Sequence, residues 1–312
     1  MSEQVLQPAN GTVADSAVMN GSSQISQAAV IHGPGVFRTI ALMATVTFVE
    51  AVRRKILWIA AFAGAAFLAL FWAALVSMLH SMSPNLTPVG RLEGVGMMTM
   101  MVLYAGSMMT SLMAALISCD TLSGEIASGT IHAIATKPVE RWCLVLGKWI
   151  GFVAMLTLYV LFIEGGTIAI ARIEGHRITP HTAAALSLIW LQAIVLLSVT
   201  ILCSTRLSAL TSGACTLGLY GLAFMGGWIE QFGAIRNIKA CVDLGILASL
   251  IMPSDALWRK VAFKVQPPIL GAAGVSPFNS SAVPSTAMVV YAIVYAVLAL
   301  VLAQIIFERR DL

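Results

Sequence analysis

Charged residues are scarce in this chain, and their scarcity excludes most water-soluble folds. Only 10% of the 312 residues are Asp, Glu, Lys or Arg, whereas 59% are hydrophobic. A soluble domain usually carries about 25% charged residues, and a buried core does not explain so large a deficit. The sequence therefore predicts a multi-pass membrane protein built from α-helices.

Several site motifs are also missing, and each absence removes a class of function. The five cysteines form no CxxC pair, so neither a zinc site nor a disulfide framework is indicated. No HExxH or GxSxG motif occurs, which leaves membrane hydrolase chemistry without a candidate nucleophile or base. Basic residues form no block typical of nucleic-acid binding. We expect no catalysis, no metal and no nucleic acid.

A phosphate-binding loop is absent as well. Such a loop needs the pattern GxxxxGK followed by Ser or Thr. Gly147-Lys148 is followed by Trp149, and Trp142 stands where the first Gly should be. Any ATP that the protein uses must therefore be bound by a partner.

The first 35 residues differ in composition from the rest. They are rich in Ser, Gln, Asn, Gly and Ala and contain no Lys or Arg. Such a composition buries too little apolar surface to fold by itself, and it lacks the basic and apolar regions of a signal peptide. We expect a disordered tail over residues 1–35, followed by a transmembrane domain over residues 36–312.

Six stretches are long and apolar enough to cross a membrane as helices, since a span needs roughly 20 apolar residues. They cover residues 56–79, 95–119, 149–170, 183–204, 209–229 and 286–307. Residues 230–285 are expected to form an external loop. Its apolar piece at 244–252 is too short to cross and fits an interfacial or re-entrant helix, and its Pro- and Gly-rich second half is expected to be irregular.

The distribution of basic residues predicts the orientation. With the N-terminus inside, 10 of the 18 Lys and Arg residues face the cytoplasm and only 3 lie in short outer loops. Positive charge favours the cytoplasmic side of short loops. Both termini are therefore expected inside.

Residues 36–55 have helical periodicity, with apolar residues on one face and polar ones on others. Glu50, Arg53 and Arg54 lie near the end of this segment. We expect an amphipathic helix on the cytoplasmic membrane surface, with its bases at the lipid headgroups. The alternative is that the first span begins early and these bases are its flank.

Residues 120–148 form a polar, sharply turned connection between spans two and three. Gly129 can end one helix and the Thr130 hydroxyl can cap the next. Pro138 fits the first turn of a further helix but not its interior. The sequence therefore predicts a compact cytosolic unit suited to contact with a partner.

This segment resembles the signature of type-2 ABC exporter permeases, including the branch that serves nitrous-oxide-reductase maturation. The pattern extends to Glu50, Arg53 and Arg54 before the first span and to residues 307–312. The resemblance implies that residues at the matching positions contact the ATPase or stabilise the segment that contacts it. These residues, which carry the central resemblance, are Glu125, Ser128, Gly129, Thr130, Lys137, Pro138, Arg141 and Lys148.

The resemblance implies a permease subunit of an ATP-driven exporter in the inner (cytoplasmic) membrane. It would pair with a second permease copy, identical or different, and with ABC ATPase subunits that hold ATP and Mg. Residues 121–130 would be the coupling helix, and residues 36–55 the helix on the membrane surface. The alternative function is an ATP-independent channel or secondary transporter, for which charges in several spans and inverted repeats would be expected.

Two further features invite a functional hypothesis. Glu164 is an ionisable residue inside span three, where charge is costly, so it is a candidate for the translocation path. A partner such as Arg172, or an interior cavity, would explain it structurally. Seven methionines lie between Met97 and Met113, and thioethers bind soft metal ions. They point around most of the helix, however, so packing is the preferred interpretation.

Overall fold

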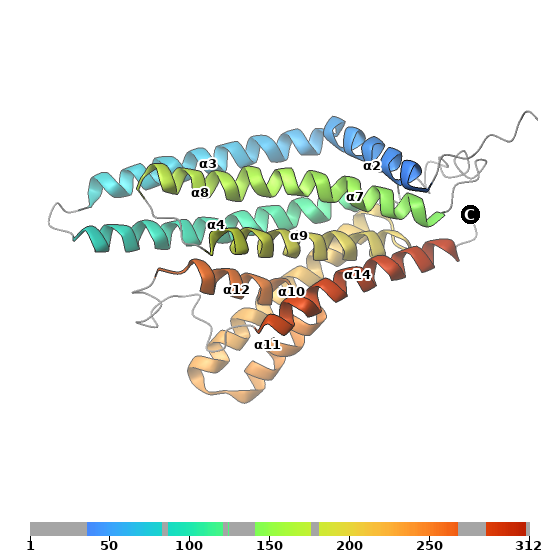
Figure 1. The fold of residues 1–312 in the computed structure, drawn as a ribbon. Helices are drawn as coiled ribbons and strands as arrows, with labels where there is room; N and C mark the ends of the chain where they lie inside the picture. The colour runs from blue at the N-terminus through green and yellow to red at the C-terminus, as the bar shows by residue number, and fades with distance from the viewer. Residues whose placement is uncertain are drawn as a thin grey trace, which may run out of the picture. The chain divides into compact units, whose positions relative to one another are not determined.

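The computed structural model describes residues 36–82, 87–120, 124, 141–175, 181–267 and 285–309, and within these ranges all regular structure is helical. The chain divides into two units, residues 1–38 and residues 39–312. Of the first unit only the three residues that begin helix α2 are described, so the predicted tail lies outside the described residues. The fold below is that of the second unit (Figure 1).

In the described part of the chain six helices are long and apolar enough to cross a membrane, which confirms the predicted number of spans. Each begins and ends within a few residues of its predicted span, with three exceptions: the second begins seven residues early, the third begins eight residues early and the fifth ends seven residues late. The spans are α3 (Lys55–Ser81), α4 (Pro88–Ser118), the continuous run of α7 (Arg141–Val160), η1 (Leu161–Gly165) and α8 (Gly166–Ile173), then α9 (Thr182–Ser204), α10 (Ala209–Arg236) and α14 (Thr286–Glu308).

Helix α9 forms the centre of the bundle. It packs against α4, α7, α10, α12 and α14, and it is apolar all round, as expected of a helix with protein on every side. The apolar part of α9 is 67% buried, compared with 17% for α3 and 28% for α10 and α14. Helices α3, α4 and α7–α8 run side by side (Figure 1).

Helix α2 (Val36–Arg53) is separated from α3 by Arg54, whose backbone is extended (φ −71, ψ 132). A helix distinct from the first span is therefore confirmed, and its place on the membrane surface stays a prediction. From Thr39 onward α2 packs on α7 through two glycines. A Cβ at Gly147 would lie 2.5 Å from Met43 Cβ, and one at Gly151 would lie 2.7 Å from the Ala44 carbonyl oxygen. Small residues four apart allow helices to approach this closely in membranes.

The region predicted as an external loop contains more helix than expected. Helix α10 continues to Arg236 and ends at Asn237, which has the left-handed conformation (φ 56) typical of a helix C-terminus. Helices α11 (Lys239–Ile251) and α12 (Ser254–Val265) follow, bent by 104° at a short break. This geometry fits a broken span or a re-entrant pair, and the Pro-rich residues 268–284 lie outside the described residues.

Glycines bring α10 and α11 together as a close hairpin. A Cβ at Gly226 would clash with Ala248, one at Gly245 with Glu230, and one at Gly233 would lie 2.6 Å from Cys241 Cβ. Gly218 and Gly221, by contrast, have no neighbouring atoms within 4 Å. The glycines in the second half of α10 therefore serve close packing.

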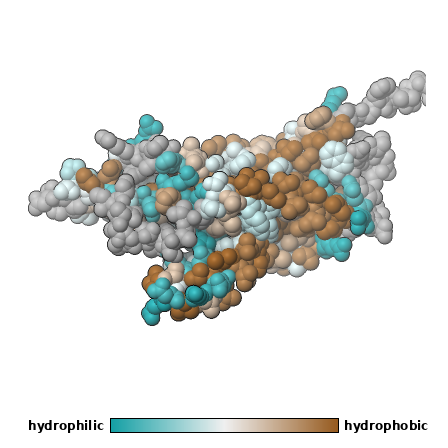
Figure 2. Space-filling model, turned by 60° about the horizontal axis from the view of Figure 1, so that its bottom comes forward, coloured by the Kyte–Doolittle hydropathy of each residue, from teal (hydrophilic) through white to brown (hydrophobic). Residues whose placement is uncertain are grey.

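The surface of the bundle is consistent with a membrane environment. Figure 2 shows one face on which hydrophobic residues occupy the middle and hydrophilic residues gather toward the ends. Large apolar side chains such as Phe62, Leu70 and Leu210 are 79%, 70% and 86% exposed. Lipid is the solvent that suits such a surface, because apolar side chains of this size are costly to expose to water.

Candidate functional site

Most of the predicted coupling residues cannot be placed. Glu125, Ser128, Gly129, Thr130, Lys137 and Pro138 lie outside the described residues, and Arg141 begins α7 without a described side chain. Lys148 is described on α7, and its side chain is buried, with 8% exposure. The predicted role of this segment therefore stays a prediction, and what the structure describes is its two ends.

The first end is tied to the break between α2 and α3. Asp120 follows α4 and begins the segment, and its carboxylate lies 3.5 Å from the Arg54 guanidinium. Arg54 also makes a closer ion pair with Glu50, at 2.8 Å. Partial burial lowers the pKa of Arg54, but the hydrogen bond and charge of Glu50, with the charge of Asp120, outweigh burial and raise it. We call Glu50, Arg54 and Asp120 the elbow cluster.

Cys119 lies beside the elbow cluster and is half-buried. Burial raises the pKa of its thiol, and the neighbouring Asp120 carboxylate raises it further. A thiol with a raised pKa is a weak nucleophile and a weak metal ligand. Cys119 is therefore a poorer nucleophile and metal ligand than a thiol of ordinary pKa.

Glu164 lies in η1, a π-helical turn that interrupts the third span. Its side chain is 0% exposed, and neither carboxylate oxygen has a hydrogen-bond partner among the described residues. Arg172, considered above as its partner, forms no described ion pair with it. The carboxylate packs on Gly106 of α4, where a Cβ would lie 2.8 Å from Oε1. π-Helical turns often occur at functional sites, so Glu164 stays a candidate.

The methionines of α4 do not converge on one point. Met100 and Met113 are buried at 0% and 3% exposure, whereas Met101 is 46% exposed. They lie on several faces of the helix, which agrees with a packing role. Within the described ranges no three His, Cys, Asp or Glu side chains come close enough to hold a metal ion.

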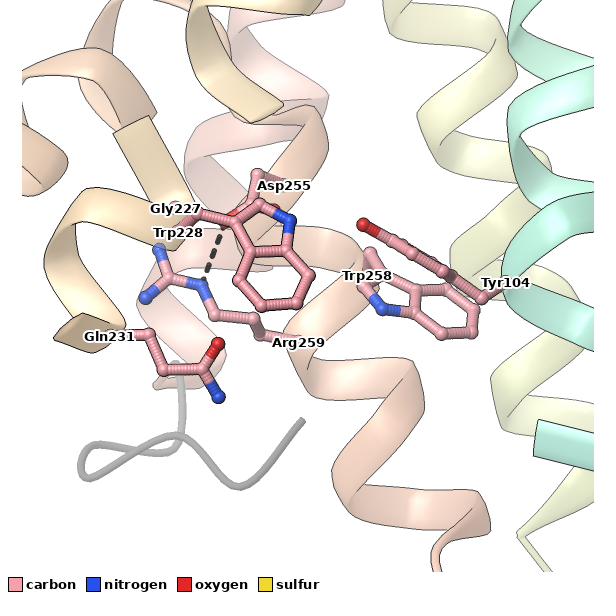
Figure 3. Close-up of a pocket in the computed structure, with 7 residues that line it drawn as sticks. All are labelled: Tyr104, Gly227, Trp228, Gln231, Asp255, Trp258 and Arg259. Atoms are coloured by element: carbon pink, nitrogen blue, oxygen red, sulfur yellow. Dashed lines mark ion pairs between the residues drawn. The ribbon is translucent and has the colours of Figure 1, made fainter. Parts of the chain in front are cut away.

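A polar pocket that the sequence did not reveal lies between α4, α10 and α12 (Figure 3). Its lining residues are Tyr104, Gly227, Trp228, Gln231, Asp255, Trp258 and Arg259. The rings of Tyr104 and Trp258 pack together, with centroids 4.7 Å apart. The Asp255 carboxylate lies directly against Gly227, a position where any Cβ would clash with it.

Arg259 organises the charges of this pocket. Its guanidinium lies 2.6 Å from Glu230 on α10 and 3.0 Å from Asp255 on α12, and it donates a hydrogen bond to Ser249 on α11 at 3.0 Å. All three ionisable side chains are largely buried, with 10% to 14% exposure. One cation therefore holds α10, α11 and α12 together, and the cluster contains two acids and one base.

The sequence contained a signal for this cluster. Asp255 and Arg259 are four residues apart, the spacing that places an acid and a base on the same helical face. The prediction of an external loop over residues 230–285 gave no reason to expect this pair to be buried. The second signal was Glu230, an acid just beyond the predicted end of an apolar span.

Comparison with protein families finds a match over most of the chain. The model described as ABC-2 family transporter protein matches residues 43–312, which begin within α2 and include every later helix. A search of curated proteins finds no match to the chain.

Proposed function

Because the chain belongs to the ABC-2 transporter family, we propose that it is an exporter permease whose transport is driven by ATP hydrolysis in a separate ATPase subunit. Membership of this family, together with the six apolar helices, makes the chain a multi-pass membrane component of an ABC transporter. The proposal includes export, coupling to a separate ATPase, pairing with a second permease copy, and location in the cytoplasmic membrane.

The observation that carries the proposal is the elbow cluster. Arg54 stands at the junction of α2 and α3, and Asp120 stands at the junction of α4 and the segment that resembles a coupling helix. A push on that segment would therefore reach the first two spans at one point. An ATPase docked there could shift both spans together.

The rest of the segment supports the same path. At its far end it enters α7, whose Gly147 and Gly151 hold α2 in close contact. Gly147 thus packs within a helix, and the Gly147-Lys148 pair does not belong to a phosphate-binding loop. This agrees with ATP being bound by a partner. Movement of the segment would act on α2 from one end and on α3 and α4 from the other.

For ATP to drive transport, nucleotide must stabilise one arrangement of the spans more than the other. We propose that closure of two ATPase subunits moves the segments of two permease copies and opens an outward path between them. Within the family, the pattern at residues 120–148 favours the branch that serves nitrous-oxide-reductase maturation.

An ATP-independent channel or secondary transporter is the second candidate, and the observation that favours it is the presence of buried charges. Glu164 lies within the third span, and Glu230, Asp255 and Arg259 lie on α10 and α12. Purified protein in vesicles separates the two functions. Transport that requires the ATPase and ATP supports the permease, and equal transport without them contradicts it.

The coupling residue Glu125 provides the sharpest test. In the family its carboxylate is expected to face basic groups of the ATPase, so Glu125→Lys replaces attraction with repulsion. We expect the ATPase to be lost from the purified complex while membrane insertion is unchanged, as measured by affinity purification and membrane fractionation.

The matched control is Asp243→Lys, the same change of charge at an exposed residue of α11. This variant should keep the ATPase. A Glu125→Lys complex of normal composition and transport rate would remove Glu125 from the proposed contact.

A further inference from the structure

We propose that a small cavity between α4, α9, α10 and α12 binds a monovalent inorganic cation such as sodium or potassium. The proposal does not depend on the direction of transport or on the identity of the ATPase. It rests on three features of the cavity: its size, its oxygen atoms without partners and the net charge of its neighbours.

The cavity adjoins the pocket of Figure 3 and shares Tyr104, Asp255 and Trp258 with it. Its other polar lining comes from Ser107 on α4, Gln192 on α9, Tyr220 on α10 and Ser254 at the start of α12. The Ser107 hydroxyl already donates to the Tyr104 carbonyl oxygen at 2.8 Å. It has room for about one water molecule or bare ion. An organic molecule would not fit in this conformation.

Two buried side chains of the lining have oxygens that lack partners. Gln192 is 2% exposed, and its amide nitrogen donates to Ser111 at 3.0 Å, while its Oε1 accepts no hydrogen bond among the described residues. Ser254 is 0% exposed, and its Oγ has no described partner either. Buried polar atoms are nearly always satisfied, so these oxygens indicate an occupant.

The charges beside the cavity are unequal. Glu230 and Asp255 together bring two carboxylates, and among the described residues Arg259 is the one base that pairs with them. Glu230 also has a buried oxygen, Oε2, that accepts no described hydrogen bond, whereas Asp255 Oδ2 is the oxygen that pairs with Arg259 Nε at 3.0 Å. An uncompensated charge is costly in a low-dielectric interior. One additional positive charge would balance the cluster.

A proton or a water molecule explains these features less completely than a metal cation. A proton on Asp255 would neutralise the charge but would donate only one hydrogen bond, leaving the Gln192 or Ser254 oxygen unsatisfied. A water molecule could donate two hydrogen bonds but would leave the charge unbalanced. A cation accepts several oxygen ligands and also supplies the charge.

The ligand set narrows the choice of cation. One carboxylate, one amide oxygen and one hydroxyl are hard ligands, which suit alkali and alkaline-earth ions rather than soft metals. An excess of one negative charge matches a monovalent ion better than a divalent one. The aromatic faces of Tyr104 and Trp258 beside the cavity also favour a cation.

Thermal unfolding of the purified full chain in detergent tests the proposal. The midpoint would be measured in sodium chloride, potassium chloride and choline chloride at equal ionic strength, with choline as the ion too large for the cavity. A ligand that binds only the folded state raises the midpoint in a saturable way. We expect a rise of about 2 °C or more with sodium or potassium.

Variants of three lining residues connect the effect with the cavity. Asp255→Asn, Gln192→Leu and Ser254→Ala should each reduce the cation-dependent rise. The last two keep the proposal testable if Asp255→Asn fails to fold. Asp243→Asn removes an exposed carboxylate from the adjacent helix α11 and should leave the rise unchanged.

Two results would overturn the proposal. Equal midpoints in sodium, potassium and choline would leave water or a proton as the occupant. A cation-dependent rise that persists in both Gln192→Leu and Ser254→Ala would place the cation elsewhere in the protein.

Discussion

Gly106 and Glu164 show how one missing side chain on one helix makes room for an acid on another. The Glu164 carboxylate fills the space that a Cβ at Gly106 would need. The sequence identified Glu164, because a single acid in an apolar span is conspicuous. It could not identify Gly106, because helical periodicity does not reveal which residue of a neighbouring helix lies opposite.

This contact predicts a specific pattern of stabilities. Gly106→Ala places a methyl group 2.8 Å from Glu164 Oε1 and 3.0 Å from Ile163 Cγ2, so we expect a loss of about 1–3 kcal/mol. Glu164→Ala should remove most of that loss in the double variant, because contacting residues are not additive. Reversible unfolding of the unchanged chain, the two single variants and the double variant measures these changes in stability.

Gly218→Ala is the matched control for this cycle. Gly218 has no atom within 4 Å of its Cβ position, so Ala there should be neutral or slightly stabilising, because it favours the helix more than Gly. Strict additivity of Gly106→Ala and Glu164→Ala would contradict the contact.

The variant Glu164→Gln distinguishes a structural role of Glu164 from a functional one. Its oxygens make no described hydrogen bonds, so Glu164→Gln removes no interaction. We expect a change in unfolding free energy of at most about 0.5 kcal/mol, and a lower rate of ATP-driven transport if the carboxyl lies on the path. Transport into vesicles and thermal unfolding measure the two effects.

Glu174→Gln is the control, since Glu174 ends the same span, is partly exposed and bonds only to Trp72 in the described region. Its transport should match that of the unchanged chain. Normal transport in Glu164→Gln would restrict Glu164 to a role in packing.

At the scale of elements, the break at Arg54 is the feature on which the proposed coupling depends. It could be predicted that a helix precedes the first span, because polar and apolar residues alternate with helical period and bases follow. The pairing of Arg54 with Asp120 could not be predicted from the sequence, because these residues are 66 positions apart. Such long-range pairs require the packed arrangement of the spans.

Charge reversal at the elbow cluster tests its role. Arg54→Asp removes the base from both Glu50 and Asp120, so ATP-driven transport is expected to fall. The loss of stability should stay below about 1 kcal/mol, because partly exposed ion pairs contribute little. Adding Asp120→Arg restores an opposite pair and should recover part of the transport rate, measured in vesicles that contain the ATPase.

Glu50→Gln is the companion variant. It removes the closer of the two ion pairs, at 2.8 Å, and leaves Asp120 in place. Near-normal transport in Glu50→Gln with no recovery in the swapped pair would show that Arg54 acts without Asp120.

The prediction of secondary structure was incomplete at helices α11 and α12. Residues 244–252 were recognised as apolar and too short to cross, which agrees with a helix that bends back. Residues 254–265 were missed because Asp255, Arg259, Lys260 and Lys264 gave them the composition of a solvated loop. In the fold, two of those charges neutralise each other within the protein.

For the molecule as a whole, length and hydrophobicity were sufficient to predict the six spans, because a bilayer imposes a minimum length on every helix that crosses it. They did not show that α9 occupies the centre. All the spans are apolar, and in lipid the difference between a buried and an exposed helix does not appear as a difference in hydrophobicity. Which small and polar residues of α9 pack against neighbouring helices becomes clear only from the structure.

The unequal lengths of the spans have a physical consequence. Helix α4 has 31 residues and α14 has 23, which correspond to about 46 Å and 35 Å at 1.5 Å per residue, against a hydrocarbon thickness of about 30 Å. No bilayer of a single thickness matches both helices, so the helices must tilt or the surrounding lipid must deform. The size of this hydrophobic mismatch changes with the acyl-chain length of the lipid. Transport in vesicles of defined lipids should therefore be fastest at one chain length and slower in thinner and thicker bilayers, whereas a rate independent of thickness would mean that the long helices simply project into water.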